Sequence, residues 1–199
     1  MANVMRSITV DSQYLNMDFS SVDELFHSVH TLKETKGWFI QIFDQYLKTL
    51  QHSALNKNDI YIDVLCECGE RVLLMVYRKQ KLCEYLQRDD IKSFLCDNGY
   101  PKEFSLMKYL AILKSRIYAQ RLMNKEFPHE IGAFLGYPLH DIYGFINHKH
   151  QGCLLTGEWK VYENTEQAKK LFCRYNKCRK AVIKRINEGR TLTDLFCIA

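Results

Sequence analysis

The stretch FPHEIGAFLGYPLHDIYGFINHKHQGCLLTGEWKVY, from Phe127 to Tyr162, combines helix signals, punctuating glycines and reactive side chains within one short span. Pro128 suits the first turn of a helix, and Gly136 suits its end. Pro138 then begins a second short helix, and residues 153–162 have strand character. Because helical and extended segments follow one another here, the stretch predicts mixed α and β structure.

A β-hairpin is predicted upstream of this stretch. Residues 60–66 alternate between apolar and polar side chains, residues 71–77 are nearly all apolar, and Cys68-Gly69-Glu70 lies between them. The second strand needs cover on both faces, so we expect it at the centre of a sheet. The predicted fold class is α+β: a small, mostly antiparallel sheet, made of the hairpin 60–77 and strand 153–162, covered by several helices.

Apolar residues at helical spacing predict the other elements. A first helix begins at a capping box of Ser21 and Glu24 and runs to about His30. A second amphipathic helix is expected between Phe39 and Leu50. The remaining expected helices are 81–87, 90–98, a longer one capped by Ser105, two short ones after Pro128 and Pro138, and a final long one that begins near Asn164.

Length and composition predict one compact domain. The 199 residues are 47% hydrophobic, with nine glycines and three prolines, and can bury one sizeable core. We expect residues 1–199 to form a single domain with a helical N-terminal part at 1–55, the motif region at 127–162 and a basic helix at 164–190. The longest apolar run, residues 72–77, is far shorter than the roughly 20 residues that cross a bilayer. Without a signal peptide either, the chain is expected to be cytoplasmic.

Eight cysteines are scattered through a chain without an export signal, so free thiols are the expected state. Cys66 and Cys68 lie on one face of a predicted strand, but there is no C-x-x-C pair, and no metal site is predicted. Cys153 is expected to be the most exposed thiol, with no base evident beside it. Cys178 belongs to the apolar stripe of the final helix and is interpreted as a small buried hydrophobe.

Charge is distributed unevenly. Between residues 168 and 190 there are nine lysines or arginines and one acid, Glu188, which gives this segment a charge of +8. Since the whole chain carries +5, the remainder carries 5 − 8 = −3. Any attraction for phosphate or other anions is therefore expected from the C-terminal segment, unless these residues form only a solvated helix face.

Several motifs occur in an order and spacing that resemble a known family. FPHEIG, FLGYP, the DIYGFI run, GxWKVY and the later FCRYNKC resemble the bacterial family catalogued as domain of unknown function 3793. The resemblance extends to YRKQKL at residues 77–82, NEGRTLTDLF near the end and HTLKETKGWF at residues 30–39, and so covers most of the chain. This chain departs from the family pattern at His30, because family members usually have a proline before the Thr-Leu pair.

The resemblance implies an intracellular protein of anaerobic bacteria and no known chemistry. It also raises the hypothesis of a redox partner such as a flavodoxin, with which a thiol-rich composition is compatible. A pull-down from an anaerobic lysate that recovers no redox protein would count against that partner. No cofactor is implied, so any mechanism has to come from the residues.

A first interpretation is a binding or accessory protein with a ligand or partner surface around FPHEIG. His129 and Glu130 follow Pro128 in a first helical turn, where backbone donors and the helix dipole favour an anion, and they are expected to point outward. The alternative is that Glu130 stabilises the helix start while His129 caps or packs. The predicted surface combines His129, Glu130, Cys153, Trp159 and Tyr162.

Trp159 and Tyr162 alternate onto opposite faces of the expected strand, so both line one pocket only if the strand bulges. Aromatic residues in such positions are more often part of a core.

A second interpretation is nucleic-acid binding. Residues 130–149 can be aligned with a helix-turn-helix pattern, although the second helix lacks base-reading side chains at its start and contains Gly144. Two short helices that pack on a core explain the same residues. The final helix would supply phosphate contacts from Lys169, Lys170, Arg174 and Lys177, with Lys180 and Lys184 beyond them.

A third interpretation is a thiol- or histidine-dependent redox or metal-linked enzyme. The chain has no phosphate-cradling glycine loop, no G-x-S-x-G and no H-E-x-x-H; HEIG lacks the second histidine because Ala133 stands in its place. A cysteine-histidine enzyme assembled from distant residues stays open, and no catalytic residue is predicted.

Overall fold

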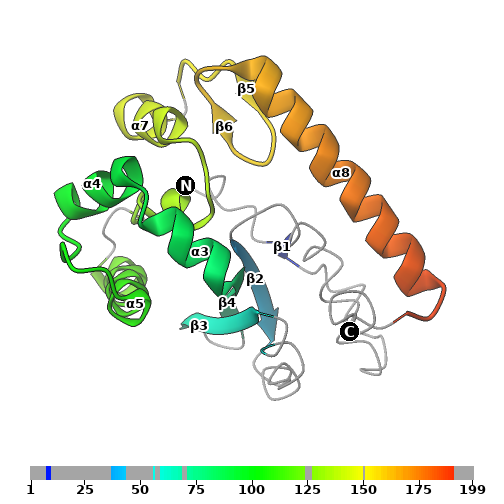
Figure 1. Cartoon of the computed structure of the whole chain (residues 1–199), viewed down its shortest axis with the longest axis horizontal. Helices are drawn as coiled ribbons and strands as arrows, with labels where there is room; N and C mark the ends of the chain where they lie inside the picture. Colours follow the sequence, from blue (N-terminus) through cyan, green and yellow to red (C-terminus); the bar gives the residue numbers. More distant parts are fainter. Residues whose placement is uncertain are drawn as a thin grey trace. The chain divides into compact units, whose positions relative to one another are not determined.

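The computed structural model describes residues 8–9, 37–43, 56, 59–68, 71–123, 127–149 and 151–190, drawn in Figure 1. The expected α+β class is confirmed, because these residues form helices α3 to α8 and two small sheets. The chain divides into two compact units: Met1–Lys79 with Lys169–Ala199, and Gln80–Ala168. That residues 1–199 form one domain stays a prediction.

The first unit contains a four-stranded sheet. Its strands are β1 (Ile8–Thr9), β2 (Gly37–Phe43), β3 (Ile60–Cys68) and β4 (Arg71–Arg78), in the order β1-β2-β4-β3. β4 pairs antiparallel with β2 and β3, and β1 pairs parallel with β2. Leu74 of β4 is fully buried and lies opposite Ile40 and Val64. The predicted hairpin and its central second strand are confirmed.

The helix expected between Phe39 and Leu50 is wrong for residues 39–43, which belong to β2. The segment GWFIQIF is rich in aromatic and β-branched residues, which suit a pleated strand. β4 also offers pairing partners along the whole segment, from Gly37 to Phe43, and this pairing prevails over the helical spacing of the apolar residues. Residues 44–50, like the helix expected at 21–30, lie outside the described residues.

The helices of the second unit follow the predicted pattern. They begin with α3 (Lys79–Leu86), α4 (Asp89–Asp97) and α5 (Leu106–Met123). The inner face predicted for α5 is confirmed, because all four of its apolar residues are buried: Leu106, Leu110, Leu113 and Ile117.

An aromatic cluster lies beside α5. The ring of Tyr109 makes edge contacts with Tyr100 and Phe104, each with centroids 5.1 Å apart, and Tyr100 also lies 5.9 Å from Phe134. Contacts of this geometry add to the stabilisation from burial. They connect α5 with the segment before it and with Phe134 downstream.

The signature segment, residues 127–162, continues the second unit with α6 (Ile131–Phe134), α7 (Leu139–His148), β5 (Leu155–Thr156) and β6 (Lys160–Val161). The predicted strand 153–162 is therefore wrong as a single strand, and it does not extend the sheet of the hairpin 60–77. β5 and β6 pair antiparallel as a separate two-stranded sheet. The physical reason is a tight turn between them, closed by a hydrogen bond from Gly157 N–H to the Trp159 carbonyl at 3.0 Å.

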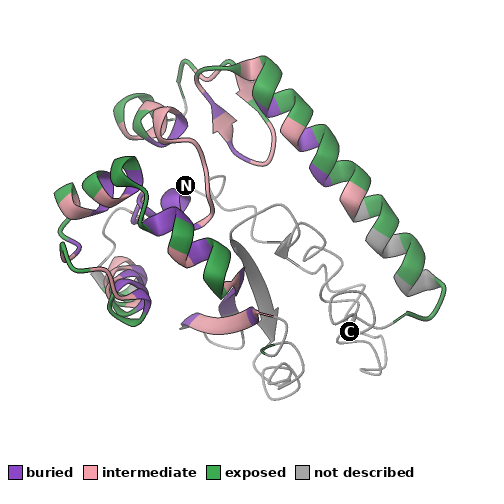
Figure 2. Ribbon diagram, viewed as in Figure 1, coloured by how far each residue is buried: buried purple, intermediate pink, exposed green. Residues whose placement is uncertain are grey.

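The long final helix is α8 (Thr165–Asn187). Ala168, Phe172 and Tyr175 are buried, as predicted, whereas Cys178 is only half-buried. Figure 2 shows a long exposed surface along the same helix. α8 therefore has one apolar side and one solvent-facing side over most of its length.

Candidate functional site

Glu130 is buried in the second unit, with 5% of its surface exposed. Its Oε1 atom forms an ion pair with the guanidinium of Arg116 on α5 and accepts a hydrogen bond from the Tyr100 hydroxyl at 3.5 Å. The prediction that Glu130 points outward is wrong. A carboxylate can be buried here because a guanidinium from another helix compensates its charge.

The half-buried Arg116 organises a small network, which we call the Glu130 cluster (Tyr100, Arg116 and Glu130). The guanidinium also donates to the Asn98 carbonyl and lies 4.9 Å from the centre of the Tyr100 ring. Burial, followed by the charge of Glu130, raises the pKa of Tyr100, so its hydroxyl stays a protonated donor. The cluster ties α5 to the segment that precedes α6.

His129 is half-buried, and its ring packs edge-on against Phe145 of α7 with centroids 5.3 Å apart. The backbone donors at the start of α6 already have acceptors within the chain. The N–H groups of Ile131 and Gly132 donate to the carbonyls of Pro128 and His129. The arrangement matches the alternative in which His129 packs. The first turn of α6 consequently offers these donors to the chain itself and not to an anion.

Asp141 on α7 is a second buried carboxylate, with 3% of its surface exposed. One oxygen, Oδ2, accepts a hydrogen bond from Trp159 Nε1 at 2.7 Å. The other, Oδ1, accepts from the backbone N–H groups of Tyr162 at 2.7 Å and Glu163 at 3.3 Å. The three donors satisfy the carboxylate and join α7 to the β5–β6 hairpin and to the residues just before α8.

Trp159 and Tyr162 flank Asp141, and we call these three residues the Asp141 cluster. Trp159 is buried and stacks on Tyr137 with ring centroids 5.0 Å apart. The Tyr162 hydroxyl donates to the Lys149 carbonyl, and burial raises its pKa. Trp159 lies in the turn before β6, so the expected alternation along one strand does not apply.

The Tyr162 ring lies directly on Gly144 of α7. A Cβ atom at Gly144 would come within 2.7 Å of Tyr162 Cβ and Cδ2, closer than real Cβ contacts allow. A glycine inside a helix costs about 1 kcal/mol relative to alanine. Here the missing side chain makes room for the aromatic ring, which explains the unusual residue.

Cys153 is a half-buried thiol, whereas Cys173 is exposed, so the expectation that Cys153 is the most exposed thiol is wrong. Its Sγ atom lies 3.9 Å from Lys160 Nζ and 3.7 Å from Thr156 Oγ1. Lys160 is the cationic neighbour that the sequence did not reveal. Among the residues that the structure describes, His, Cys, Asp and Glu side chains form no group of three that could hold a metal ion.

The five predicted site residues do not share one set of contacts. Trp159 and Tyr162 meet at Asp141, Glu130 contacts Arg116 and Tyr100, and His129 packs on Phe145. Whether any of them binds a ligand stays a prediction. The side-chain contacts of Glu130, Asp141 and His129 join different segments of the same unit.

Sequence reasoning missed Arg116 and Asp141, the two residues that organise these clusters. A signal existed for Arg116: it is a cation next to the apolar positions 113 and 117 of α5, where a buried counter-charge is needed. The signal for Asp141 was weaker. Acids are common in the first turn of a helix, where the helix dipole favours them, so an acid there does not by itself indicate a buried site.

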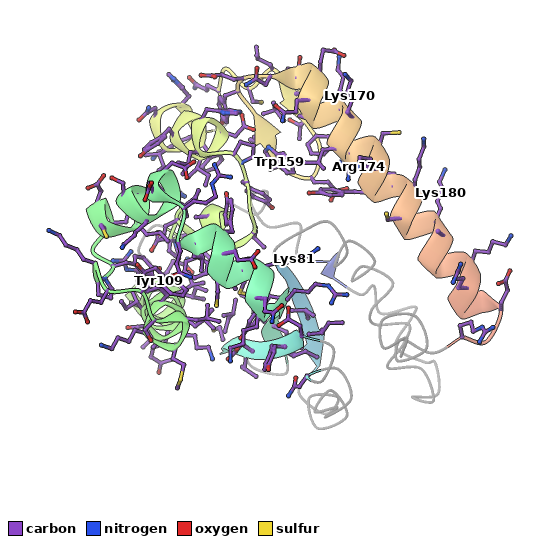
Figure 3. The ribbon with its side chains drawn as sticks, in the orientation of Figure 1. Lys81, Tyr109, Trp159, Lys170, Arg174 and Lys180 are labelled. Atoms are coloured by element: carbon purple, nitrogen blue, oxygen red, sulfur yellow. The ribbon has the colours of Figure 1, made fainter. Side chains whose placement is uncertain are left out.

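The lysines and arginines of α8 that were predicted to contact anions are exposed, as that prediction requires. Figure 3 labels Lys170, Arg174 and Lys180 along this helix. The positions 170, 174, 177, 181 and 184 recur at intervals of three and four and so share one side. The exposed cations are Lys169, Lys170, Arg174, Lys177, Lys180, Lys184 and Arg185.

Acids occur only near the two ends of α8. Glu166 precedes the basic positions, and Glu188 follows them, with its Oε1 atom 3.9 Å from Lys184 Nζ. Between residues 167 and 187 the sequence contains no Asp or Glu. The exposed side of α8 is therefore a continuous cationic surface, which we call the α8 basic face (residues 169–185).

The helix-turn-helix interpretation of residues 130–149 receives little support. α6 has only 4 residues, about one turn, and α7 has 10. Asp141 is buried and Gly144 is covered by Tyr162, so much of α7 already packs on its own unit. Tyr143, Asn147 and His148 of α7 stay exposed, so it is the single turn of α6 that disfavours a helix-turn-helix.

A family model described as protein of unknown function (DUF3793) matches residues 25–196. The chain belongs to the DUF3793 family. The matched region includes the signature segment and all of α8, and the family description assigns no activity. Comparison of this DUF3793 chain with curated proteins and with solved structures gives no match. No helix among its described residues is long and apolar enough to span a membrane.

Proposed function

We propose that this DUF3793 protein is a binding or accessory protein that contacts the phosphates of a nucleic-acid duplex through the α8 basic face. The observation that carries the proposal is the run of exposed cations on one helix, with no acid between residues 167 and 187. Lysine and arginine side chains placed near phosphates release condensed counterions, and this release drives non-specific association.

The composition of the exposed side favours a duplex over other polyanions. Phe172 and Tyr175 are buried, so the described part of α8 offers no aromatic platform for stacking unpaired bases. None of the large apolar side chains that are exposed in the described structure lies on α8, which disfavours insertion into a lipid surface. A phosphate backbone requires only the cations.

The dimensions also suit a duplex. From Lys170 to Arg185, α8 rises about 22 Å at roughly 1.5 Å per residue. One cation per turn over this length can contact successive phosphates along a groove edge. Contacts of this kind carry no sequence information, so we propose binding without base specificity, with a Kd of roughly 10⁻⁴–10⁻⁶ M at physiological salt.

The test is the salt dependence of binding to a short fluorescent DNA duplex, measured by anisotropy with the full chain. A variant with Lys170→Glu, Arg174→Glu and Lys177→Glu should bind at least about tenfold more weakly and show a shallower salt dependence. The matched control carries Lys81→Glu, Lys92→Glu and Lys102→Glu, which change the net charge equally outside α8. An equal loss of DNA affinity in both variants, or no loss of affinity in the α8 variant, would contradict the proposal.

A further inference from the structure

Helix α5 has a second apolar side that faces solvent. Met107 is 84% exposed, Leu122 64% and Tyr118 56%. Together with the exposed Ala111 they recur at intervals of four, seven and four residues and so lie on one side of the helix. Single exposed apolar residues are ordinary, but several large ones aligned on one helix mark an interaction surface.

We propose that this α5 stripe (Met107, Ala111, Tyr118 and Leu122) is a docking surface for an acidic amphipathic helix of a partner protein. The stripe extends over about 22 Å, since it covers 15 residue steps at roughly 1.5 Å each. This length matches about four turns of a partner helix, whose apolar residues would pack between those of the stripe.

Charge identifies the kind of partner. α5 contains no Asp or Glu among its 18 residues, and Lys108 and Lys114 flank the stripe. A partner helix with Glu or Asp beside its apolar side complements these lysines, whereas a partner with lysines there repels them. The same rule disfavours a second copy of this chain, because two α5 stripes face to face would bring lysines together.

An anionic membrane surface fits this face less well. Membrane recognition by charge typically needs clusters of about 4–8 lysines and arginines. Among the described side chains, the cations beside the stripe are Lys108 and Lys114, fewer than such a cluster needs. The α5 stripe lies on a different helix from the α8 basic face, so a failure of nucleic-acid binding would leave the docking proposal intact.

The probe is a pair of synthetic helical peptides with the same leucine stripe, one with glutamates and one with lysines at the flanking positions. Anisotropy with the full chain should show the glutamate peptide binding at least tenfold more tightly than the lysine peptide. The variant Tyr118→Glu with Leu122→Glu should lose at least tenfold in affinity. The matched control, Ser93→Glu with Asn147→Glu, adds the same charge at exposed polar positions and should bind as the parent does.

Three results would overturn the proposal: no binding of the glutamate peptide, equal binding of both peptides, or an equal loss of affinity for the glutamate peptide in the stripe variant and in the control variant. Sedimentation that shows self-association of the parent chain, abolished by Tyr118→Glu with Leu122→Glu, would assign the stripe to a second copy instead. Binding to phosphatidylserine vesicles that the same pair of changes removes would assign it to a lipid surface. Circular dichroism checks that each variant is folded.

Discussion

The signature segment buries two acids, whereas α8 exposes most of its cations. In the signature segment Glu130 and Asp141 are buried, and partners from neighbouring elements satisfy them. On α8 the described cations, Lys169 to Arg185, face solvent. The signature segment therefore builds part of the interior of one unit, whereas the proposed binding surface lies on α8. Recognition of a family and location of its function are separate questions here.

The largest effect is expected where the buried Glu130 loses the half-buried Arg116 as its ion-pair partner. Arg116→Met leaves the Glu130 carboxylate buried without its cation, which should lower the free energy of unfolding by about 3–5 kcal/mol. Urea denaturation measures this loss. Adding Glu130→Gln should recover most of it, because the uncompensated charge is then gone. A change at an exposed lysine of the same helix, Lys108→Met, should have an effect within about 0.5 kcal/mol.

The next effect comes from the close contact at Gly144. Helix propensity alone predicts that Gly144→Ala stabilises α7 by about 1 kcal/mol. The contact with Tyr162 predicts the opposite sign, a loss of about 1–3 kcal/mol from overpacking. Thermal or urea denaturation decides between the two. In a Tyr162→Ala background the same change should become neutral or stabilising, and a stabilising effect in the parent chain would contradict the described packing.

Asp141→Asn tests the link between α7 and the β5–β6 hairpin. The amide keeps one acceptor oxygen but turns an NH₂ group toward backbone donors, so we expect a loss of about 2 kcal/mol. Because Trp159 donates to Asp141, its fluorescence emission should shift to the red as the indole gains contact with water. Unchanged emission together with unchanged stability would show that the Asp141 cluster does not hold the hairpin.

These contacts show what the sequence could and could not predict. The α+β class, the hairpin with its central second strand and the inner face of α5 followed from apolar spacing, because burial imposes that spacing directly. The strand β2 was missed, since its segment also fits a helical period and only pairing with β4 decides the outcome. Periodicity alone cannot resolve such a segment.

The interior of the candidate site was less predictable. That Glu130 is buried depends on Arg116, 14 residues earlier and on another helix. Asp141 depends on Trp159 and Tyr162, 18 and 21 residues away in the chain. Local sequence signals do not report such distant partners. The cations of α8 were predictable because exposure on an amphipathic helix follows from the position of its apolar residues.

A smaller effect, with a pH signature, is expected at Tyr85. Its hydroxyl donates to the Tyr137 carbonyl at 3.2 Å, and burial raises the pKa of Tyr85 to about 12. The contribution of Tyr85 to stability should be complete below the unfolded pKa of about 10 and be lost as the pH rises to about 12. Tyr85→Phe should therefore cost about 1 kcal/mol at pH 7. The difference from the parent chain should narrow above pH 10 in urea denaturation, and a difference independent of pH would contradict this assignment.

The smallest effect on stability, and the most direct test of the contrast between the two regions, belongs to the α8 variant with Lys170→Glu, Arg174→Glu and Lys177→Glu. The deciding measurement is the slope of log affinity against log salt concentration for a DNA duplex, compared with that of Asp141→Asn under conditions in which both variants are folded. We predict that Asp141→Asn keeps the parent slope, while the α8 variant flattens it by about 2–3 units. A flattened slope for Asp141→Asn with an unchanged slope for the α8 variant would contradict the account.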